Sequence, residues 1–382
     1  MKIVIAVDSF KGSLSSVEAG KAIEKGIRRV YLNSEIVIKP LADGGEGTVE
    51  ALIAGLNGKL RTVKVTGPLG EMVNCCYGII ESKTMAVIEM AQVSGLTLVP
   101  ESKRNPLYTT TYGLGQVIKD AINQGCRRFI IGIGGSATND GGIGMLQALG
   151  FELLDKDGKQ VDFGALGLKN LKIIKTDKAL PVLKECDFMI ACDVNNPLCG
   201  LLGSSTVYGP QKGADKELIE EMDNWLNRYA ILSKKIYPLA NADYPGVGAA
   251  GGLGFAFLTF LNAQLDLGSK LILKEINFEE DIKDADLVIT GEGNLDFQTT
   301  MGKAPIGVAK LAKKYNLPVI AFAGSVSNDA NMCNDIGIDA YFSILRNIVT
   351  LSEAMNKQRA EMNIINTVEQ VFRLWKIKED HT

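Results

Sequence analysis

The stretch Lys2-Ile3-Val4-Ile5-Ala6-Val7-Asp8-Ser9-Phe10-Lys11-Gly12-Ser13 indicates how the chain folds. Its first half is apolar and mostly β-branched, which is typical of a parallel strand buried on both faces. The elements predicted next are, in order, a helix, a strand and a helix, at residues 17–30, 35–39 and 49–54. This alternation predicts an α/β fold built on a parallel sheet.

The same alternation returns toward the carboxyl end of the sequence. The predicted elements there are strands at residues 285–290, 317–323 and 340–345, and helices at 306–315 and 352–375. The last helix is long and amphipathic, because its apolar residues recur at helical spacing. We therefore predict that residues 1–60 and 285–382 form one doubly wound parallel-sheet domain.

The middle of the chain, residues 61–284, has a different pattern. It is richer in glycine loops and contains hairpin-like strands near residues 60–65, 75–81 and 85–90. A length of 382 residues also suggests about two domains. We predict that this middle segment forms a second α/β domain inserted into the first.

Composition and charge narrow the class of protein. The formal net charge is −3, so no overall positive field favours nucleic acid or an anionic membrane as a partner. The seven cysteines include no Cys-x-x-Cys pair, which favours the reduced thiols of a cytoplasmic protein. The apolar run before Asp8 is too short for a signal peptide, and the run at residues 253–265 is too short to cross a bilayer.

The single histidine, His381, stands next to the last residue of the sequence. A Ser-His-Asp triad, a histidine-ligated metal and the His-Arg-Asp loop of protein kinases are therefore excluded. Catalysis must use carboxylates, lysines, hydroxyls, backbone amides or a carboxylate-bound Mg²⁺.

The glycine-rich run from Gly132 to Gly144 carries the densest chemical pattern in the sequence. It follows a predicted strand and precedes a predicted helix, where glycine amides and hydroxyls can approach an anion without any lysine. The candidate binding residues in this run are Gly134, Gly135, Ser136, Thr138, Asn139 and Asp140.

Acidic loops follow three strands of the predicted outer sheet. Asp8 and Lys11 follow the first strand, Asp43 follows the second, and Asp296 ends the loop after the strand at 285–290. Because parallel sheets bind ligands at the carboxyl ends of their strands, we expect these side chains to converge. Several carboxylates gathered there suit Mg²⁺, which prefers one or two carboxylates plus water and phosphate oxygens.

The middle segment adds three polar positions. Asp193 follows an apolar strand at residues 188–191, and Arg104 precedes three threonines, Thr109–Thr111, with which it could clamp a carboxylate. Lys212 lies in the turn Gly209-Pro210-Gln211-Lys212-Gly213. Each segment alone also fits an ordinary turn.

Several glycine patterns have other interpretations. Walker A is absent, and Asp162-Phe163-Gly164 lacks the other protein-kinase motifs. Residues 132–137 and 246–251 fit the loose dinucleotide pattern, but only the first follows a strand. A nicotinamide-dependent hydroxy-acid dehydrogenase and a non-catalytic sugar-acid sensor therefore stay open as alternatives.

The chain resembles the bacterial glycerate kinase family, of the glycerate 2-kinase type. The matching stretches are DSFKGSLS from Asp8, PLADGGEGT from Pro40, TGPLG from Thr66, RNP from Arg104, IGIGGSATNDGG from Ile131, GPQKGA from Gly209, GAAGGLG from Gly248 and TGEG with Leu295-Asp296. The sequence departs from the family pattern at Val7, where proline is common, and at Asn294, where arginine is expected.

The resemblance implies phosphoryl transfer from ATP-Mg²⁺ to D-glycerate in a cleft between two α/β domains. The glycine run and Lys11 would then cradle phosphates, and Asp193 or Asp296 would anchor Mg²⁺. Asp8 or Asp43 would orient or deprotonate the attacking hydroxyl. Arg104 and Lys212 would hold the glycerate carboxylate. The phosphorylated oxygen, the substrate enantiomer and the oligomeric state stay open.

Overall fold

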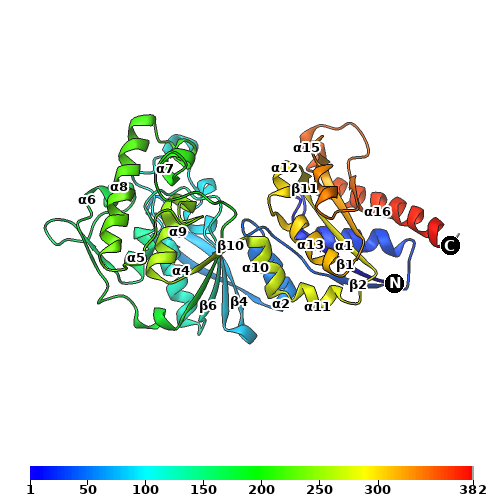
Figure 1. Ribbon diagram of the computed structural model, residues 1–382, viewed down its shortest axis with the longest axis horizontal. Coiled ribbons are helices and arrows are strands. Elements are labelled where there is room, and N and C mark those ends of the chain that lie inside the picture. Colours follow the sequence, from blue (N-terminus) through cyan, green and yellow to red (C-terminus); the bar gives the residue numbers. More distant parts are fainter. Residues whose placement is uncertain (381–382) are drawn as a thin grey trace. The chain divides into compact units, whose positions relative to one another are not determined.

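In the computed structural model, which describes residues 1–380, the apolar run at the start of the sequence forms strand β1 (Lys2–Val7). β1 pairs with two strands of a five-stranded sheet of order β13-β12-β11-β1-β2, and every pairing in it is parallel. The other strands are β2 (Glu35–Ile38), β11 (Leu287–Leu295), β12 (Val319–Val326) and β13 (Ala340–Ser343). The α/β fold with a doubly wound parallel sheet is confirmed (Figure 1).

The chain divides into two compact units. Unit 1 comprises residues 1–43, 50–57 and those from 267 onward, and unit 2 comprises residues 44–49 and 58–266. Helices α10 (Gly268–Glu275) and α11 (Phe278–Ile282), which we assigned from sequence to the middle segment, lie in unit 1. Both contact α13 (Ala304–Lys314) there. His381 lies outside the described residues.

The sheet of unit 1 is covered on both faces. Ile3, Ile5 and Val7 pack in the apolar core with helices α1 (Ser16–Arg28) and α16 (Lys357–Asp380). Val4 and Ala6, which point to the other face, are also fully buried, and α13 contacts both β1 and β11. The remaining helices that begin or lie in this unit are α2 (Thr48–Leu56, whose first two residues belong to unit 2), α12 (Phe297–Thr300), α14 (Met332–Asp335) and α15 (Leu351–Ala354).

The long helix predicted at residues 352–375 is two helices, so this prediction was wrong in its length. The first, α15, begins with a capping box between Thr350 and Glu353. The second, α16, begins after Asn356, whose side-chain oxygen accepts a hydrogen bond from the Arg359 amide at 3.0 Å. A side chain that bonds the amide three residues onward starts a new helix, and the amphipathic pattern does not reveal this break.

Unit 2 is built on a six-stranded sheet of order β10-β9-β6-β5-β4-β3. β3, β4 and β5, which correspond to the predicted hairpin-like strands, pair in antiparallel fashion, and the other strands run parallel to β5. The strands are β3 (Lys59–Thr66), β4 (Met72–Ile80), β5 (Met85–Glu89), β6 (Arg128–Gly132), β9 (Asp187–Ala191) and β10 (Gln264–Asp266). A separate antiparallel pair consists of β7 (Glu152–Leu154) and β8 (Ile173–Lys175).

The helices of unit 2 pack with this sheet around one apolar core. They are α3 (Ala91–Ser94), α4 (Tyr112–Asn123), α5 (Ile143–Ala148), α6 (Ala165–Asn170), α7 (Ser204–Tyr208), α8 (Lys216–Lys234) and α9 (Ala249–Phe260), with 3₁₀ turns at Glu81–Lys83, Leu96–Leu98, Glu101–Lys103, Pro181–Glu185 and Pro210–Lys212. Helix α9 is interrupted near its start, because Ala250, Gly251 and Gly252 have left-handed φ angles of 52°, 72° and 86°.

Two further sequence predictions concern membrane spans and cysteines. Within residues 1–380, no helix is both long and apolar enough to cross a bilayer. All seven cysteines lie in the described residues and are free thiols. Burial raises the pKa of several of these thiols, including those of Cys75 and Cys199, to about 12 in both cases.

The contact between α1 and α16 leads to a prediction about Gly26. A Cβ atom added at Gly26 would lie 2.7 Å from both the carbonyl oxygen of Ile365 and the Cβ of Val368. Gly26→Ala should therefore lower the stability of unit 1 by about 1–3 kcal/mol through overpacking. Thermal unfolding followed by circular dichroism measures the effect. Lys21→Ala, on the exposed side of α1, is the control and should change stability by less than about 0.5 kcal/mol. A Gly26→Ala protein as stable as wild type would contradict this packing.

Candidate functional site

Asp8 lies at the carboxyl end of β1, in unit 1. Its amide donates to the carbonyl oxygen of Gly291 at 2.9 Å, which continues the parallel pairing with β11. The side chain is only 3% exposed, and its Oδ1 accepts a hydrogen bond from the Ser9 amide at 2.6 Å. Burial, reinforced by the neighbouring carboxylate of Asp43, raises the pKa of Asp8 to about 7. This carboxyl can therefore gain or lose a proton near neutral pH.

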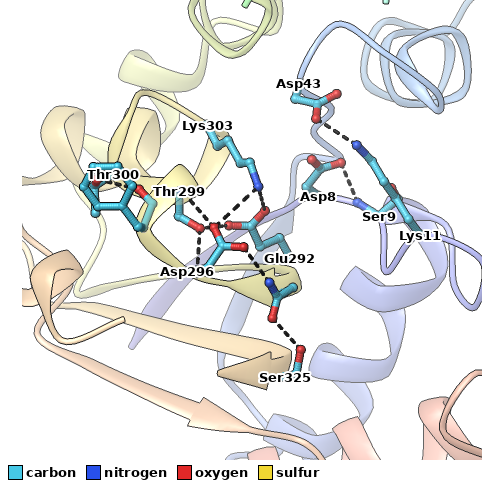
Figure 2. A network of polar contacts seen from close by, with 12 residues as sticks. Asp8, Ser9, Lys11, Asp43, Glu292, Asp296, Thr299, Thr300, Lys303 and Ser325 are labelled. Atoms are coloured by element: carbon cyan, nitrogen blue, oxygen red, sulfur yellow. Dashed lines mark hydrogen bonds and ion pairs between the residues drawn. The ribbon is translucent and has the colours of Figure 1, made fainter. Parts of the chain in front are cut away.

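Lys11 and Asp43 form an ion pair beside Asp8. The Nζ of Lys11 lies 2.9 Å from Oδ2 of Asp43, and the lysine side chain is largely exposed (Figure 2). Burial lowers the pKa of Lys11, but the charges of Asp43, Asp8 and Glu292 outweigh it and raise the pKa overall. The lysine therefore stays protonated and keeps a positive charge next to Asp8.

Glu292 is a second buried carboxylate at this edge of the sheet. It lies on β11, is 6% exposed, and accepts a hydrogen bond on Oε1 from Oγ1 of Thr299 at 2.5 Å. Its Oε2 lies 3.6 Å from Nζ of Lys303, the residue that precedes α13. Burial raises the pKa of Glu292, whereas the hydrogen bond from Thr299 and the charge of Lys303 act in the opposite direction.

Asp296 has both carboxylate oxygens engaged (Figure 2). Its Oδ1 caps α12 by accepting from the Thr299 amide at 3.3 Å, and also lies 3.9 Å from Nζ of Lys303. Its Oδ2 accepts from the side-chain nitrogen of Asn294 at 2.6 Å. Asn294 accepts in turn from the hydroxyl of Ser325 at 2.5 Å. Asn294, which replaces the expected arginine, thus holds Asp296 by a neutral hydrogen bond.

These side chains form one group, which we call the carboxylate cluster: Asp8, Asp43, Glu292 and Asp296, with Lys11 and Lys303 as its cations. Burial, together with the charges of the neighbouring acids, raises the pKa values of Asp8 and Glu292, the two most buried acids. The carboxylates of this group can take up protons or bind a cationic ligand. Its lysines can bind a phosphate-bearing ligand. The prediction that Asp8, Lys11, Asp43 and Asp296 converge at one sheet edge matches this arrangement.

Glu292 and Lys303 were not among the residues predicted from sequence. Glu292 stands in the stretch Gly291-Glu292-Gly293, which belongs to β11, and Lys303 follows a glycine directly before a helix. Both signals are visible in the sequence. The sequence does not show that these two residues lie close together, because only the fold places Lys303, which follows α12, beside the end of β11.

The glycine-rich run in unit 2 forms a turn between β6 and α5, which we call the glycine turn (residues 133–142). Its two ends differ in exposure. Gly134 and Gly135 are exposed, whereas Ser136 is 7% exposed and Thr138, Asn139 and Asp140 are completely buried. The amides near Gly134 can thus reach a ligand, while the last three residues lie inside the unit.

Asp140 organises the buried end of the glycine turn. Its Oδ2 accepts from the amide and the hydroxyl of Thr111 at 2.9 and 2.8 Å, and its Oδ1 accepts from the Gly142 amide at 3.0 Å. Burial raises the pKa of Asp140, although these hydrogen bonds act to lower it. The carboxylate of Asp140 therefore links Thr111 to the glycine turn by hydrogen bonds inside unit 2.

The other predicted segments of the middle domain also lie against the glycine turn. The hydroxyl of Thr109 donates to the carbonyl oxygen of Ala137 at 2.8 Å. A Cβ added at Gly213 would lie 2.2 Å from the carbonyl oxygen of Arg104, so the 209–213 turn contacts the arginine segment. The Nε of Arg104 is buried and has no hydrogen-bond partner among the described residues, so it is an unsatisfied donor.

Lys212 and Asp193 have contrasting surroundings. Lys212 is 1% exposed, and its Nζ donates to the carbonyl oxygen of Thr138 at 2.6 Å. Asp193 is exposed and follows β9, whose Ala191 pairs in parallel register with Gly132 of β6. Asp193 and the exposed end of the glycine turn therefore share one edge of the sheet.

Sequence and structural comparisons identify the relatives of this chain. Residues 3–376 match the model of the glycerate kinase family. A glycerate 2-kinase of Escherichia coli (strain K12) is 51% identical over 373 residues, which cover 96% of this chain and 98% of the relative. A glycerate kinase of Halalkalibacterium halodurans is 50% identical over 355 residues, or 93% of each chain.

A solved structure agrees with these relatives. The crystal structure assigned to glycerate kinase 2 of Salmonella typhimurium LT2 superposes with a TM-score of 0.92 at 46% identity. The match covers 100% of this chain and 99% of that one. This chain therefore belongs to the glycerate kinase family and is a kinase.

Proposed function

We propose that this kinase transfers the γ-phosphoryl group of ATP to D-glycerate and forms 2-phosphoglycerate. The name of the E. coli relative, glycerate 2-kinase, supports the position of transfer. The observation that carries the proposal is Asp8, a buried carboxyl with a pKa of about 7 at the carboxyl end of a parallel strand. It combines the chemistry and the place that deprotonation of a substrate hydroxyl requires.

Asp8 is the proposed general base. A group with a pKa near 7 can accept a proton at neutral pH and release it after turnover. The proton of the attacking glycerate hydroxyl would pass to a carboxylate oxygen of Asp8. The hydroxyl oxygen would bond to the γ-phosphorus of ATP as the bond from that phosphorus to the β,γ-bridging oxygen breaks, and ADP would leave with that oxygen.

The two lysines of the carboxylate cluster would neutralise phosphate charge. Lys11 is held by Asp43 at 2.9 Å and remains largely exposed, so it can turn toward a ligand. Lys303 lies 3.6 and 3.9 Å from its two carboxylate partners, which are loose contacts for an ammonium group. Stabilising the charge on the transferred group is the main task of a protein in this reaction.

Mg²⁺ would be held by Asp296 or Asp193, together with phosphate oxygens and water. The excess of carboxylates over lysines in unit 1 fits a divalent cation, and carboxylate oxygens are the ligands that Mg²⁺ prefers. Within residues 1–380, no three acidic, cysteine or histidine side chains gather as a ready-made site. The ion would draw charge from the phosphate oxygens when bound.

The exposed end of the glycine turn would bind phosphate through its amides, and Arg104 would bind the glycerate carboxylate. The unpartnered Nε of Arg104 supports this role, because a carboxylate would satisfy it.

That the two units share one active-site cleft stays a prediction. Membership in a kinase family replaces the dehydrogenase and sensor interpretations with a phosphotransferase.

The product of the reaction tests the proposal directly. Purified protein incubated with D-glycerate and ATP-Mg²⁺ should form ADP and 2-phosphoglycerate, identified by ³¹P and ¹H NMR. Formation of 3-phosphoglycerate would contradict the proposed position. Formation of ADP with L-glycerate but not with D-glycerate would contradict the proposed enantiomer.

Asp8→Asn should separate activity from stability. The raised pKa means that the wild-type carboxyl favours folding below about pH 4 and loses this contribution as the pH rises through about 7. The melting temperature of Asp8→Asn relative to wild type should therefore increase from pH 4 to pH 8. Its kcat should fall by roughly 10²–10⁴-fold because the base is lost.

Asp335→Asn is the matched control for Asp8→Asn, since Asp335 is exposed on α14 and the charge change is identical. It should keep wild-type turnover, and its melting temperature should differ from wild type by the same amount at both pH values. Near-normal kcat in Asp8→Asn would exclude Asp8 as the base.

Arg104→Met should weaken glycerate binding. Loss of a charged hydrogen-bond donor costs about 1.5–3 kcal/mol, so the KM for glycerate should rise roughly 10–150-fold. The KM for ATP should change little. Lys103→Met, at the exposed neighbouring position, is the control. Steady-state kinetics with each substrate varied separately measures both constants, and an unchanged KM for glycerate would refute the assignment.

A further inference from the structure

Lys212 is a completely buried lysine in unit 2. It ends the 3₁₀ turn Pro210–Lys212 and is 1% exposed. Lysines are almost never fully buried unless a specific partner holds them. The partner here is the carbonyl oxygen of Thr138, at 2.6 Å from Nζ. The ammonium group thus points into the glycine turn and away from the surface.

Burying this ammonium works against stability. Burial lowers the pKa of Lys212 to about 7, and only the buried carboxylate of Asp140 counteracts the shift. That carboxylate accepts hydrogen bonds from Thr111 and Gly142, and it acts on Lys212 through its negative charge. Removing a charge from water is costly, and replacing a whole buried ion pair by apolar groups of similar size is often neutral or stabilising. Stability therefore does not account for a lysine at this position.

The carbonyl group that Lys212 holds is also fixed from the other side. A Cβ added at Gly251 would lie only 2.0 Å from the Thr138 oxygen. Gly251 is the middle one of the three left-handed residues that interrupt α9. Left-handed conformations are costly for Ala250, which carries a Cβ, and such strain persists where the surroundings impose it. The Thr138 peptide is therefore held between a charge and a strained backbone.

Polar atoms of the same turn lack partners. Thr138 Oγ1 and Asn139 Oδ1 are buried without a hydrogen bond to any described residue. The Asn139 side-chain nitrogen donates to Oγ of Ser205 at 2.9 Å, which leaves its oxygen unpaired. Unpaired buried polar atoms destabilise a fold. The hydrogen bond from Lys212 is thus one of the contacts that fix this turn, beside those of Thr109 and Asp140.

We propose that Lys212 is a positioning residue, which fixes the Thr138 carbonyl and through it the direction of the exposed amides at Gly134 and Gly135. This inference rests on the proposed function, in which those amides bind phosphate. It replaces a direct contact between Lys212 and the glycerate carboxylate. The lysine lies behind the turn, and its hydrogen bond selects one of the conformations that the glycines allow.

Lys212→Met tests the proposal, because methionine has a similar length and no charge. We expect a melting temperature within a few degrees of wild type and a kcat reduced roughly 10–100-fold, since small displacements of phosphate-binding groups cost about that much. The KM for glycerate should change less than about threefold. Lys212→Gln, which keeps a donor without the charge, should recover part of the lost kcat.

The controls separate this inference from the proposed function. Wild-type protein must first phosphorylate glycerate, and a failure there refutes the proposed function whatever Lys212 does. Lys216→Met, at an exposed position of α8, should behave like wild type. A large rise in the KM for glycerate with unchanged kcat in Lys212→Met would show a direct substrate contact and overturn the proposal. Unchanged kinetics, or loss of folding in both Lys212 variants, would overturn it as well.

Discussion

The parallel pairing of β1 with β11 is the constraint on which the unit 1 site depends. It joins the Asp8 amide to the Gly291 carbonyl and so places the loop after β1 beside the acidic end of β11, although the two are far apart in the sequence. The strands are buried on both faces, so the pairing cannot slip without exposing apolar side chains. Asp8 and Glu292 are consequently held in a poorly solvated place, where each carboxyl has a raised pKa.

Both units contain charges that are buried at the expense of stability. In unit 1 they are Asp8 and Glu292 of the carboxylate cluster, whose pKa values burial raises. In unit 2 they are Asp140, which lies in the glycine turn, and Lys212, which donates to that turn from the 3₁₀ turn Pro210–Lys212. Perturbed ionisable groups concentrate where proteins perform chemistry, and a kinase has the task of managing phosphate charge. The two groups thus fit the family to which the chain belongs.

The two ends of the glycine turn differ in their surroundings. Its end near Gly134 and Gly135 is exposed, whereas its end from Thr138 to Asp140 is buried. Asp140 braces it through Thr111, and Asn139 bonds to Ser205. From the sequence alone, all six candidate residues of the run appeared equivalent. The residues differ in burial because the chain reaches the surface just after β6 and then passes through the interior of unit 2 before α5 begins.

The sequence by itself determined the alternating elements, the hairpin-like strands near residues 60–90, and the convergence of Asp8, Lys11, Asp43 and Asp296. Buried strands require continuous apolar runs, and parallel strands collect their following loops at one edge, so both features can be read from residue order. Only the tertiary structure decided that Glu292 and Lys303 join this group, that α10 and α11 pack with unit 1, and that Asn356 starts a new helix. It also decided that Lys212 is buried. These outcomes depend on which side chains meet across the fold, and local patterns do not encode the burial and hydrogen-bond partners that such meetings create.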